Sequence, residues 1–360
     1  MVIRDRVWFN SARFWQKSER PNEPLLQAPA KLFDVELSGD PNVGAKEDSY
    51  GNTWESEVTQ DGEFVRHQTS FRSQIRADGS TDFAPETGRY HLYVSYACPW
   101  AHRTLIARKL KGLEQAISFD VVDPVLPSTG WSLNSSAPGA KGDTVNGFQD
   151  LREAYQASNS SFEGAITVPV LWDKQTRQIV NNESAEILRM FNSEFQHCAS
   201  NRDLDLYPEG RRKQIDELND WIYPGINNGV YRCGFATKQA AYSAAFKELF
   251  SALDRAEEVL ASSRYLTGST LTEADVRLFT TLVRFDSVYV AHFKCNLRRI
   301  VDYPNLWGYT RDLFQTKGVA ETVNMSHIKT HYFVSHRQIN PSRIIPDGPA
   351  LDFESPHGRD

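Results

Sequence analysis

Residues 90–112 read YHLYVSYACPWAHRTLIARKLKG, and the fold follows from this stretch. Residues 91–95 form a short run of strand-forming residues, and residues 97–100 turn the chain at a proline. Residues 101–111 then place apolar side chains along one side of a helix. Residues 116–122 supply a second strand. A strand, a helix and a strand in this order predict a parallel pair of strands joined by the helix.

The next segment extends this unit with one more helix and a hairpin. A helix is expected near residues 149–157, after a long loop rich in Pro, Gly, Ser and Asn. Residues 167–172 and 177–181 are predicted as two strands joined by a tight turn. An amphipathic helix over residues 184–195 closes the segment. We therefore predict an α/β domain over residues 89–205.

From residue 206 onward the pattern changes to helical periodicity without strands. Helices are predicted over residues 211–222, 240–261, 272–290 and 306–314. The third begins with a capping pair formed by Thr272 and Asp275. These segments predict an all-α domain over residues 206–345, followed by a tail over residues 346–360.

Residues 1–88 are predicted to form an irregular extension. The stretch is polar and is interrupted repeatedly by proline and glycine. It still carries Trp8, Trp15, Trp54 and Phe71, large apolar groups that a free tail does not need. We therefore expect the extension to lie against the body of the protein or against a partner subunit.

The composition is that of an ordinary globular protein. At 360 residues the chain is long for one domain and sufficient for two, with 40% hydrophobic and 24% charged residues. Its net charge of −6 argues against nucleic acid or an anionic membrane surface as a partner. No apolar run is long enough to span a bilayer, and residues 1–30 show no secretory signal. We therefore expect a cytoplasmic location.

Cys98 carries the clearest chemistry in the sequence. It directly precedes Pro99, a residue that suits the first turn of a helix. The N–H groups and the positive dipole end of a helix start stabilise a thiolate, so we expect a lowered pKa for this thiol. The position three residues later is Ala101, so a mixed disulfide at Cys98 must be resolved by an external thiol. The other cysteines, Cys198, Cys233 and Cys295, are expected to be small buried hydrophobic residues.

Two further features mark a candidate binding site. Val168 precedes Pro169 at the start of a predicted strand, where a proline is unusual unless its peptide bond is cis or the strand lies at an edge. Residues 181–184 read NNES and begin a helix. Such a start binds a carboxylate well, although helix capping alone also explains these residue types.

These elements, in this order and followed by a helical domain, resemble the glutathione transferase fold, in which a thioredoxin-like α/β domain precedes an all-α domain. GSTLTEAD (268–275) matches the capping segment of its helical domain. Several longer motifs are similar to the xi class, the glutathionyl-hydroquinone reductases. They are YACPWAHR (96–103), GWS (130–132), NESAEI (182–187), WIYPGINNGVY (221–231), RFDSVY (284–289) and HFKCN (292–296), with Tyr332 near Ser335 and His336. The resemblance covers residues 60–345.

The resemblance implies a glutathione site beside a pocket for an aromatic quinol. The implied catalytic residues are Cys98 as the nucleophile, with Tyr223 and Tyr332. The implied glutathione-binding residues are Trp131, Val168 through its backbone, Glu183 and Ser184. The implied substrate-binding residues are Tyr223, Tyr289 and Tyr332. For each tyrosine, packing in the core or at an interface is the alternative.

The implied reaction is the glutathione-dependent reduction of glutathionyl-hydroquinones to hydroquinones. It proceeds through a mixed disulfide between Cys98 and glutathione, and a second glutathione releases oxidised glutathione. Glutathione is thus the expected co-substrate, and no metal is expected. The resemblance also implies a homodimer. Two departures from the xi pattern bear on the range of acceptors: Leu133 stands where an aromatic residue is expected, and residues 134–146 are a candidate insertion.

Three other interpretations remain open from the sequence. A thiol transferase or dehydroascorbate reductase like the omega class shares the helix-starting Cys-Pro pair. A carrier of planar aromatic ligands would bind without turning its ligand over. His327 and His331, four residues apart with His336 nearby, have a spacing that can hold a metal, but no accompanying carboxylate completes a metalloprotease pattern. Ordinary packing is the favoured interpretation of these histidines.

Overall fold

The computed structural model describes residues 57–359. It divides the chain into two units, residues 1–46 and residues 47–360, and the second unit contains every described residue. The predictions for Trp8, Trp15 and Trp54 lie outside the described residues. None of the helices formed by residues 57–359 combines the length and the apolar character that a membrane span requires.

A four-stranded mixed sheet forms the core of the first half. Its strands are β1 (Tyr90–Val94), β2 (Ile117–Val121), β3 (Val170–Asp173) and β4 (Gln178–Asn181), in the order β2-β1-β3-β4. β1 and β2 run parallel, as predicted, with Tyr90 opposite Ile117 and Val94 opposite Val121. β3 is antiparallel to both β1 and β4. Every residue of β1 and β3 is buried, as expected for strands covered on both faces.

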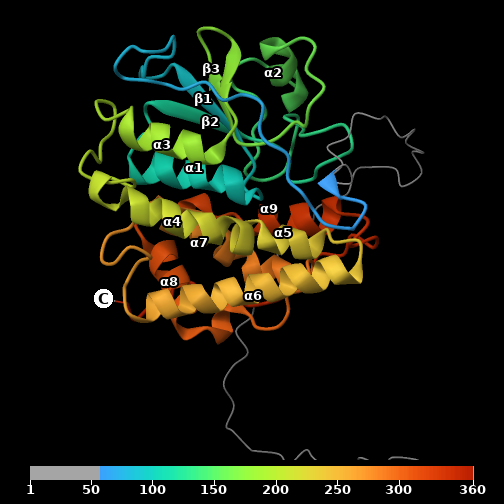
Figure 1. Cartoon of the computed structure of the whole chain (residues 1–360). Helices are drawn as coiled ribbons and strands as arrows, with labels where there is room; N and C mark the ends of the chain where they lie inside the picture. Colours follow the sequence, from blue (N-terminus) through green and yellow to red (C-terminus); the bar gives the residue numbers. More distant parts are fainter. Residues whose placement is uncertain (1–56, 360) are drawn as a thin grey trace, which may run out of the picture. The chain divides into compact units, whose positions relative to one another are not determined.

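Three helices belong to this sheet. They are α1 (Pro99–Leu110), α2 (Leu151–Ser158) and α3 (Ser184–Ser193). α1 and α3 pack against each other and lie between the sheet and the helices of the second half (Figure 1). α2 starts with a capping box in which Asp150 and Glu153 exchange bonds with the backbone. The three predicted helices are thus present, with ends shifted by two residues or fewer.

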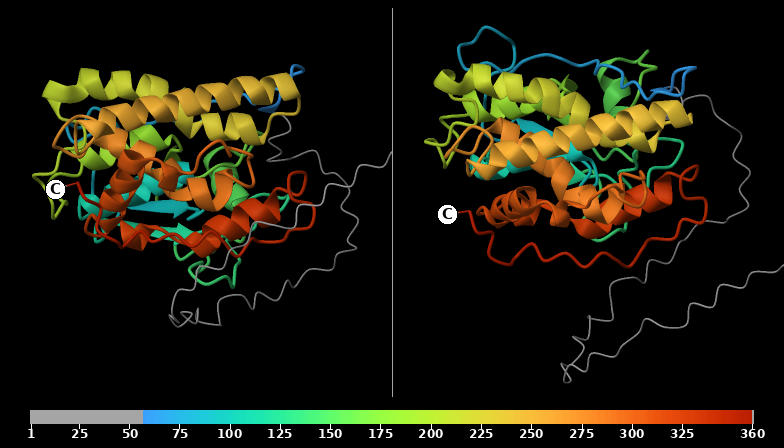
Figure 2. Two further views of the ribbon diagram at one scale, coloured as in Figure 1. Left: turned by 90° about the horizontal axis from the view of Figure 1, so that it is seen from below. Right: turned by 60° about the horizontal axis from the view of Figure 1, so that its bottom comes forward.

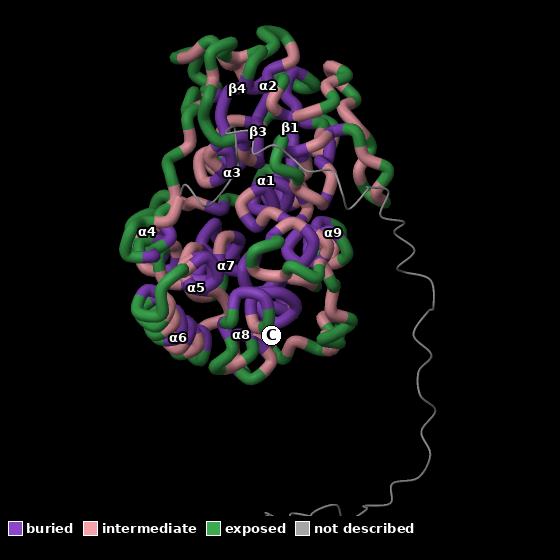
Figure 3. The backbone as a smooth tube through the Cα atoms, turned by 90° about the vertical axis from the view of Figure 1, so that its right-hand side faces the viewer, coloured by how far each residue is buried: buried purple, intermediate pink, exposed green. Residues whose placement is uncertain are grey.

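The second half contains helices only. They are α4 (Arg212–Ile222), α5 (Gly229–Gly234), α6 (Gln239–Ala261), α7 (Glu273–Arg284), α8 (Pro304–Gln315) and α9 (Met325–Thr330). α7 is buried along nearly its whole length, whereas the outer face of α6 is exposed (Figure 3). The predicted pair at the start of α7 is present, since the Asp275 carboxylate accepts bonds from the N–H and hydroxyl of Thr272.

Three of these helices end in a π-helical turn. Tyr223–Asn227 follows α4, Phe285–Tyr289 follows α7, and His331–Ser335 follows α9. The single helix predicted over residues 272–290 is therefore wrong in its last turn. The short helices α5 and α9 were not predicted, because six residues are too few to show a helical period.

The described part of the N-terminal extension lies against the body of the protein, as predicted. Phe64 and Ile75 are buried in the hydrophobic core. The backbone N–H of Phe71 donates to the side-chain oxygen of Asn182, and its C=O accepts from the Asn182 N–H at 3.0 Å. Arg72 forms an isolated bridge with Asn181 at the end of β4. The extension therefore continues the sheet edge close to the start of α3.

The C-terminal segment also lies against the body. The Phe353 ring stacks on Phe314 and contacts Trp307, both from α8. The Arg359 guanidinium donates to the C=O groups of Leu260 and Ser263 after α6. This segment runs beside the helices in the right-hand view of Figure 2. The predicted domain boundaries at residues 88, 205 and 345 stay predictions.

Candidate active site

Cys98 lies at the start of α1, where the sequence placed it. It is the N-cap residue, with an extended backbone, and Pro99 occupies the first helical position. Its sulfur accepts a hydrogen bond from the Ala101 N–H at 3.5 Å. The thiol also lies 3.5 Å from the C=O of Val168, to which it can donate. The Val168-Pro169 peptide bond is cis. The backbone at Val168 therefore faces the sulfur across the site.

The net effect of the surroundings on this thiol is opposite to our expectation. Burial raises the pKa of Cys98, and this outweighs the N–H groups of Ala101 and Trp100, which lower it. The charges of Arg66 and Arg284 also lower the pKa. The predicted contribution of the helix start has the right sign, but the prediction of a lowered pKa is wrong. The sequence could not reveal how closely protein atoms enclose the sulfur.

Arg284 fixes the loop that presents Cys98. This guanidinium is fully buried near the end of α7. It donates to the C=O of Ala97 at 2.9 Å and to the C=O of Tyr96 at 2.8 Å. A third bond joins it to His102 Nδ1 at 3.0 Å. Arg284 therefore ties the helical half to the two residues that precede the cysteine and places a fixed positive charge behind it.

The predicted glutathione-binding residues Glu183 and Ser184 lie at the start of α3. The Glu183 carboxylate caps this helix by accepting from the Ala185 N–H at 3.1 Å. The buried Ser184 hydroxyl accepts from Arg103 at 3.4 Å. Burial lowers the pKa of Arg103 to about 9. A helix start beside a buried cation can bind the carboxylate of a peptide, so the two residues fit the γ-glutamyl end of glutathione.

The ring contact of Trp131 is made with the helical half of the protein. It is buried, and its ring stacks on His331 with centroids 5.1 Å apart. His331 in turn contacts the ring of Tyr332 at 5.3 Å. Trp131 therefore joins the aromatic part of the site through His331.

Tyr289 and Tyr332 are brought together, and a third tyrosine joins them. The Tyr332 hydroxyl lies 2.6 Å from that of Tyr231 and 3.0 Å from that of Tyr289. All three are buried, and burial raises the pKa of each phenol. These phenols therefore stay protonated at neutral pH and can act as donors. We call Tyr231, Tyr289 and Tyr332 the tyrosine cluster.

Tyr223 lies outside the tyrosine cluster. Its ring centroid is 5.6 Å from that of Trp100, which also lies 6.2 Å from Tyr231. Tyr223 lines a cavity of about 550 Å³ together with Pro224 and with charged and polar residues from α3, α4 and α7. Those residues are Arg189, Asp216, Asn219, Asp220, Pro224 and Arg277. Trp100 thus separates Tyr223 from the cluster.

Sequence reasoning missed Tyr231 and Arg66. Tyr231 stood inside the motif at residues 221–231, but only its first tyrosine was selected. The available signal was its place at the end of that motif, and the structure puts its ring centroid 6.2 Å from that of Trp100. Arg66 lies in the extension, and its guanidinium carbon is 4.9 Å from the Trp100 ring centroid. No motif in the sequence pointed to it.

The histidines weighed as a metal site make separate contacts. The His327 ring donates to the C=O of Pro138 at 2.7 Å, and the His331 ring donates to the C=O of Pro124 at 3.0 Å. His336 instead bonds to His292 at 3.1 Å. Each side chain thus has a packing role, which agrees with the favoured interpretation.

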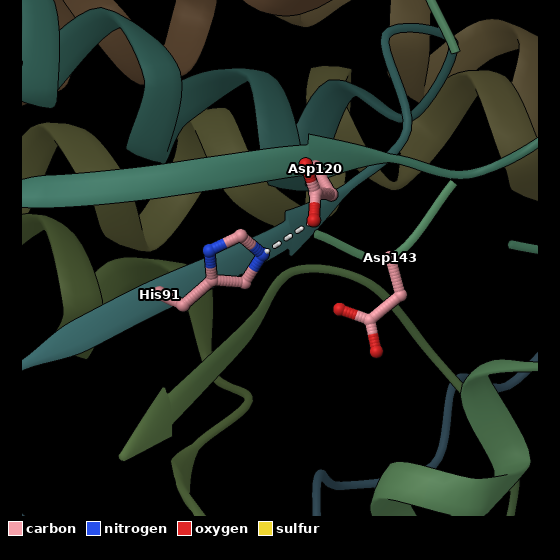
Figure 4. A group of neighbouring side chains, drawn as sticks. All are labelled: His91, Asp120 and Asp143. Atoms are coloured by element: carbon pink, nitrogen blue, oxygen red, sulfur yellow. Dashed lines mark ion pairs between the residues drawn. The ribbon is translucent and has the colours of Figure 1, made fainter. Parts of the chain in front are cut away.

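Another cluster, His91 with Asp120 and Asp143, has ligand atoms within 4.8 Å of one another (Figure 4). Asp120 already accepts from the Thr144 N–H at 2.6 Å and from the Thr144 hydroxyl at 2.8 Å. Asp143 accepts from the backbone N–H groups of residues 145, 146 and 148 and from the Tyr93 hydroxyl. These bonds engage both oxygens of Asp143 and Oδ2 of Asp120, so the cluster fits the anchoring of the loop at residues 143–148 better than a cation.

The two departures from the xi pattern lie in well-bonded parts of the chain. Leu133 is buried in the core, and its N–H donates to the C=O of Gln149 at 2.8 Å. The loop at residues 134–146 is tied down by the Ser135 hydroxyl on Asp123 and by the bonds to Asp143. The backbone around Leu133 is thus fixed next to Trp131.

Comparisons with known proteins agree with this geometry. Residues 97–194 match the N-terminal domain of glutathione S-transferases, and residues 239–312 match their C-terminal domain. The chain is 52% identical over 315 residues to glutathionyl-hydroquinone reductase YqjG of Escherichia coli, covering 86% of this chain and 96% of that protein. It is 46% identical to glutathionyl-hydroquinone reductase PcpF of Sphingobium chlorophenolicum, covering 83% and 94%.

Solved structures give the same result. The glutathione-bound structure of YqjG matches with a TM-score of 0.78 at 53% identity, covering 83% of this chain and 97% of that chain. The xi transferase of Phanerochaete chrysosporium matches with a TM-score of 0.80 at 53% identity, covering 83% and 96%. The predicted fold and family are confirmed. This chain belongs to the glutathione transferase family and, within it, to the xi class of enzymes.

Proposed function

We propose that this enzyme reduces glutathionyl-hydroquinones to hydroquinones with glutathione, through a covalent intermediate on Cys98. The observation that carries the proposal is the position of Cys98 at the start of α1, opposite the Val168 C=O and with Ala101 at the third position after it. A lone cysteine in such a place can form a mixed disulfide but needs an outside thiol to resolve it. The reductases YqjG and PcpF support the choice of substrate.

In the first step the Cys98 thiolate attacks the sulfur of the substrate. Breaking an aryl carbon–sulfur bond directly would leave a carbanion, which is a poor leaving group. Protonation of the ring carbon that bears the sulfur, with loss of the proton from the neighbouring ring hydroxyl, first converts the hydroquinone to its keto tautomer. The electron pair of the carbon–sulfur bond then passes into the ring and restores the aromatic phenolate. A sulfur–sulfur bond forms at Cys98, and the free hydroquinone takes up a proton.

Phenol donors are the natural source of the ring proton. Tyr231 and Tyr332 form a hydrogen-bonded pair, and burial keeps both protonated at neutral pH. We assign this role to the pair. The hydrogen bond between the Tyr289 and Tyr332 hydroxyls orients Tyr332. Tyr223, beside Trp100, is assigned to the binding of the aromatic ring rather than to proton transfer.

In the second step another glutathione thiolate attacks the mixed disulfide. The glutathione sulfur bonds to the bound glutathionyl sulfur, Cys98 leaves as a thiolate, and oxidised glutathione departs. Glu183 and Ser184, at the start of α3, are assigned to the γ-glutamyl end of the tripeptide, and the Val168 backbone to its cysteine. Trp131 is assigned to the remaining surface of glutathione near His331.

A substrate comparison tests the reaction against the alternatives. Purified enzyme would be assayed with glutathionyl-menadiol, with dehydroascorbate and with a chloronitrobenzene conjugation substrate. We expect a preference for glutathionyl-menadiol, and a preference for dehydroascorbate would instead support an omega-like thiol transferase.

Cys98→Ala separates an enzyme from a carrier. Because the sulfur forms the covalent intermediate, we expect the variant to lose activity by at least about 1,000-fold. The control is Cys198→Ala, which removes another partly buried thiol and should keep full turnover. If Cys98→Ala kept most of its turnover, the mechanism would be wrong. If the wild-type protein bound aromatic ligands but turned none of them over, it would be a carrier.

We also propose a cytoplasmic homodimer. The family resemblance supports the dimer, and the four cysteines, all among the described residues, are free, as expected in a reducing compartment. Sedimentation equilibrium at micromolar concentration should give twice the mass of the chain. Microscopy of a fluorescent fusion in its native cell tests the location.

A further inference from the structure

Arg66 is a cation in the N-terminal extension that lies among aromatic rings. Its guanidinium carbon lies 4.9 Å from the Trp100 ring centroid, 5.3 Å from that of Tyr231 and 5.7 Å from that of Phe64. Its buried Nε has no hydrogen-bond partner, and no carboxylate of residues 57–359 pairs with the group. Among residues 57–359, Arg66 is therefore a cation without an ion-pair partner.

Its neighbours in the same extension behave differently. Arg72 forms an ion pair with Glu186, and Arg76 forms one with Glu194 at 3.4 Å, both on or beside α3. Those two arginines fasten the extension to the body. Arg66 forms no such ion pair within residues 57–359, although its contact with aromatic faces is favourable. A half-buried guanidinium with free donors is suited to hold an anion.

The charge of Arg66 acts on the reacting sulfur. Cys98 lies two residues before Trp100, the ring that Arg66 covers. Arg66 acts electrostatically on Cys98 and on Tyr231. The other titratable groups that interact with this sulfur are Arg284 from α7, Arg103 from α1 and Tyr231 from α5.

Of the three arginines, Arg66 is the one for which the described residues 57–359 show ring contacts and no side-chain hydrogen bond. Arg284 is engaged with Ala97, Tyr96 and His102. Arg103 donates to Ser184 and to Asn227. Both charges are thus fixed by their bonds. Arg66, held only by ring contacts, can shift toward a sulfur that becomes negative.

We propose that Arg66 supplies positive charge that favours the thiolate form of Cys98, so that the N-terminal extension takes part in catalysis. This inference deepens the proposed function, because it concerns the same sulfur. Arg66 acts on the reaction only through its electrostatic effect on Cys98, and is therefore a positioning residue. The extension then has a second role besides covering the sheet edge, since removing it would remove a charge from the active site.

The test is the pH dependence of Cys98 alkylation in the full-length protein. Wild type, Arg66→Met and Arg66→Lys would be treated with iodoacetamide between pH 5 and 10, and the Cys98 peptide would be quantified by mass spectrometry. Met keeps most of the aliphatic packing without the charge, so alkylation of Arg66→Met at pH 7 should be about tenfold slower, with its midpoint about one pH unit higher. Lys should restore most of the rate.

Arg76→Met is the matched control, because it removes an arginine of the same extension that faces Glu194. Its alkylation profile should match wild type. An unchanged profile in Arg66→Met would overturn the proposal. Should Arg66→Met fail to fold, Arg66→Gln takes its place with the same expected shift and the same overturning result.

Alkylation needs no substrate, so the outcome is independent of the proposed reaction. A shifted profile in an enzyme that does not turn over glutathionyl-menadiol would retain the role of Arg66 and reject the reaction. Normal turnover of glutathionyl-menadiol with an unshifted alkylation profile would retain the reaction and reject the role of Arg66.

Discussion

The two sides of the active site are held in different ways. On the thiol side, the Cys98 sulfur accepts from the Ala101 N–H and faces the Val168 C=O, and the Glu183 carboxylate accepts from the Ala185 N–H. On the phenol side, Tyr231, Tyr289 and Tyr332 are placed by one another's side chains. The thiol side thus depends on two helix starts, whereas the phenol side depends on packing.

Buried histidines complete the packing of the phenol side. The rings of His292 and His336 stack with centroids 5.3 Å apart, and both contact the ring of Tyr332. His331 lies between Tyr332 and Trp131. Burial lowers the pKa of all three histidines, so they are neutral at physiological pH. This difference predicts that the two sides respond differently to acid and to single substitutions.

Acid should reduce the stability of the folded protein through the phenol side, and this is the largest effect that we expect. Burial lowers the pKa of His292 and of His331 from 6.5 to about 4. Between those values the unfolded chain binds protons that the folded protein excludes, so stability is lost as the pH falls from 6.5 toward 4. The loss is about 3 kcal/mol for each histidine over the whole range. Urea denaturation at stepped pH values measures it.

A pair of variants assigns this loss to the phenol side. His331→Gln keeps a donor for the Pro124 C=O but cannot become charged, so its stability should fall less steeply with acid. His197→Gln removes an exposed histidine and should leave the wild-type slope unchanged. A wild-type stability that stays flat between pH 6.5 and 4 would contradict the assignment of neutral buried histidines.

Tyr332→Phe should separate the two sides chemically. The change removes the hydroxyl shared by Tyr231 and Tyr289 and keeps the ring. If the cluster donates the ring proton, turnover of glutathionyl-menadiol should fall by about 100-fold. Alkylation of Cys98 should be unchanged, because the backbone contacts of the thiol side remain. Steady-state kinetics and the alkylation assay measure the two effects.

Tyr309→Phe is the matched control for this change. Its hydroxyl is also buried and donates to Asp275 at 2.9 Å, but it lies at the start of α7 away from the tyrosine cluster. We expect lower stability and normal turnover. If Tyr332→Phe lost no more turnover than this control, the cluster would be packing only.

The same division explains what the sequence could predict. The thiol side is encoded locally, because Cys98-Pro99 and NNES at residues 181–184 mark helix starts by residue type alone. The four strands and the longer helices likewise follow from periodicity. Burial of the Cys98 sulfur raises its pKa, and this burial depends on how distant parts of the chain pack around it, so the direction of the pKa shift could not be predicted.

The phenol side is encoded over long distances. Tyr289 and Tyr332 each lie in a π-helical turn, and Tyr231 lies in a helix of six residues. A π-helical turn changes the direction of its side chains relative to the preceding α-helix, and the period of 3.6 residues does not reveal it. The resemblance supplied Tyr289 and Tyr332, but the cluster itself emerged only in three dimensions.

The smallest effect that we expect concerns the surface charges of the thiol side. Arg72 donates to Glu186 at 3.0 Å, with 45% of its side chain exposed. Glu186 also accepts from Gln74 and Asn181, so Arg72→Gln leaves it with partners. The loss of stability should be less than about 1 kcal/mol, as is usual for exposed ion pairs. Chemical denaturation measures it.

Asn182→Ala is the contrasting change at the same contact. Asn182 is buried, and its side chain accepts from the Phe71 N–H at 3.1 Å and donates to the Tyr155 hydroxyl at 3.1 Å. Removing it leaves both groups without that partner, so we expect a loss of about 1–3 kcal/mol. A larger loss for Arg72→Gln than for Asn182→Ala would mean that surface charge holds the extension in place. The thiol side would then resemble the phenol side in depending on side chains.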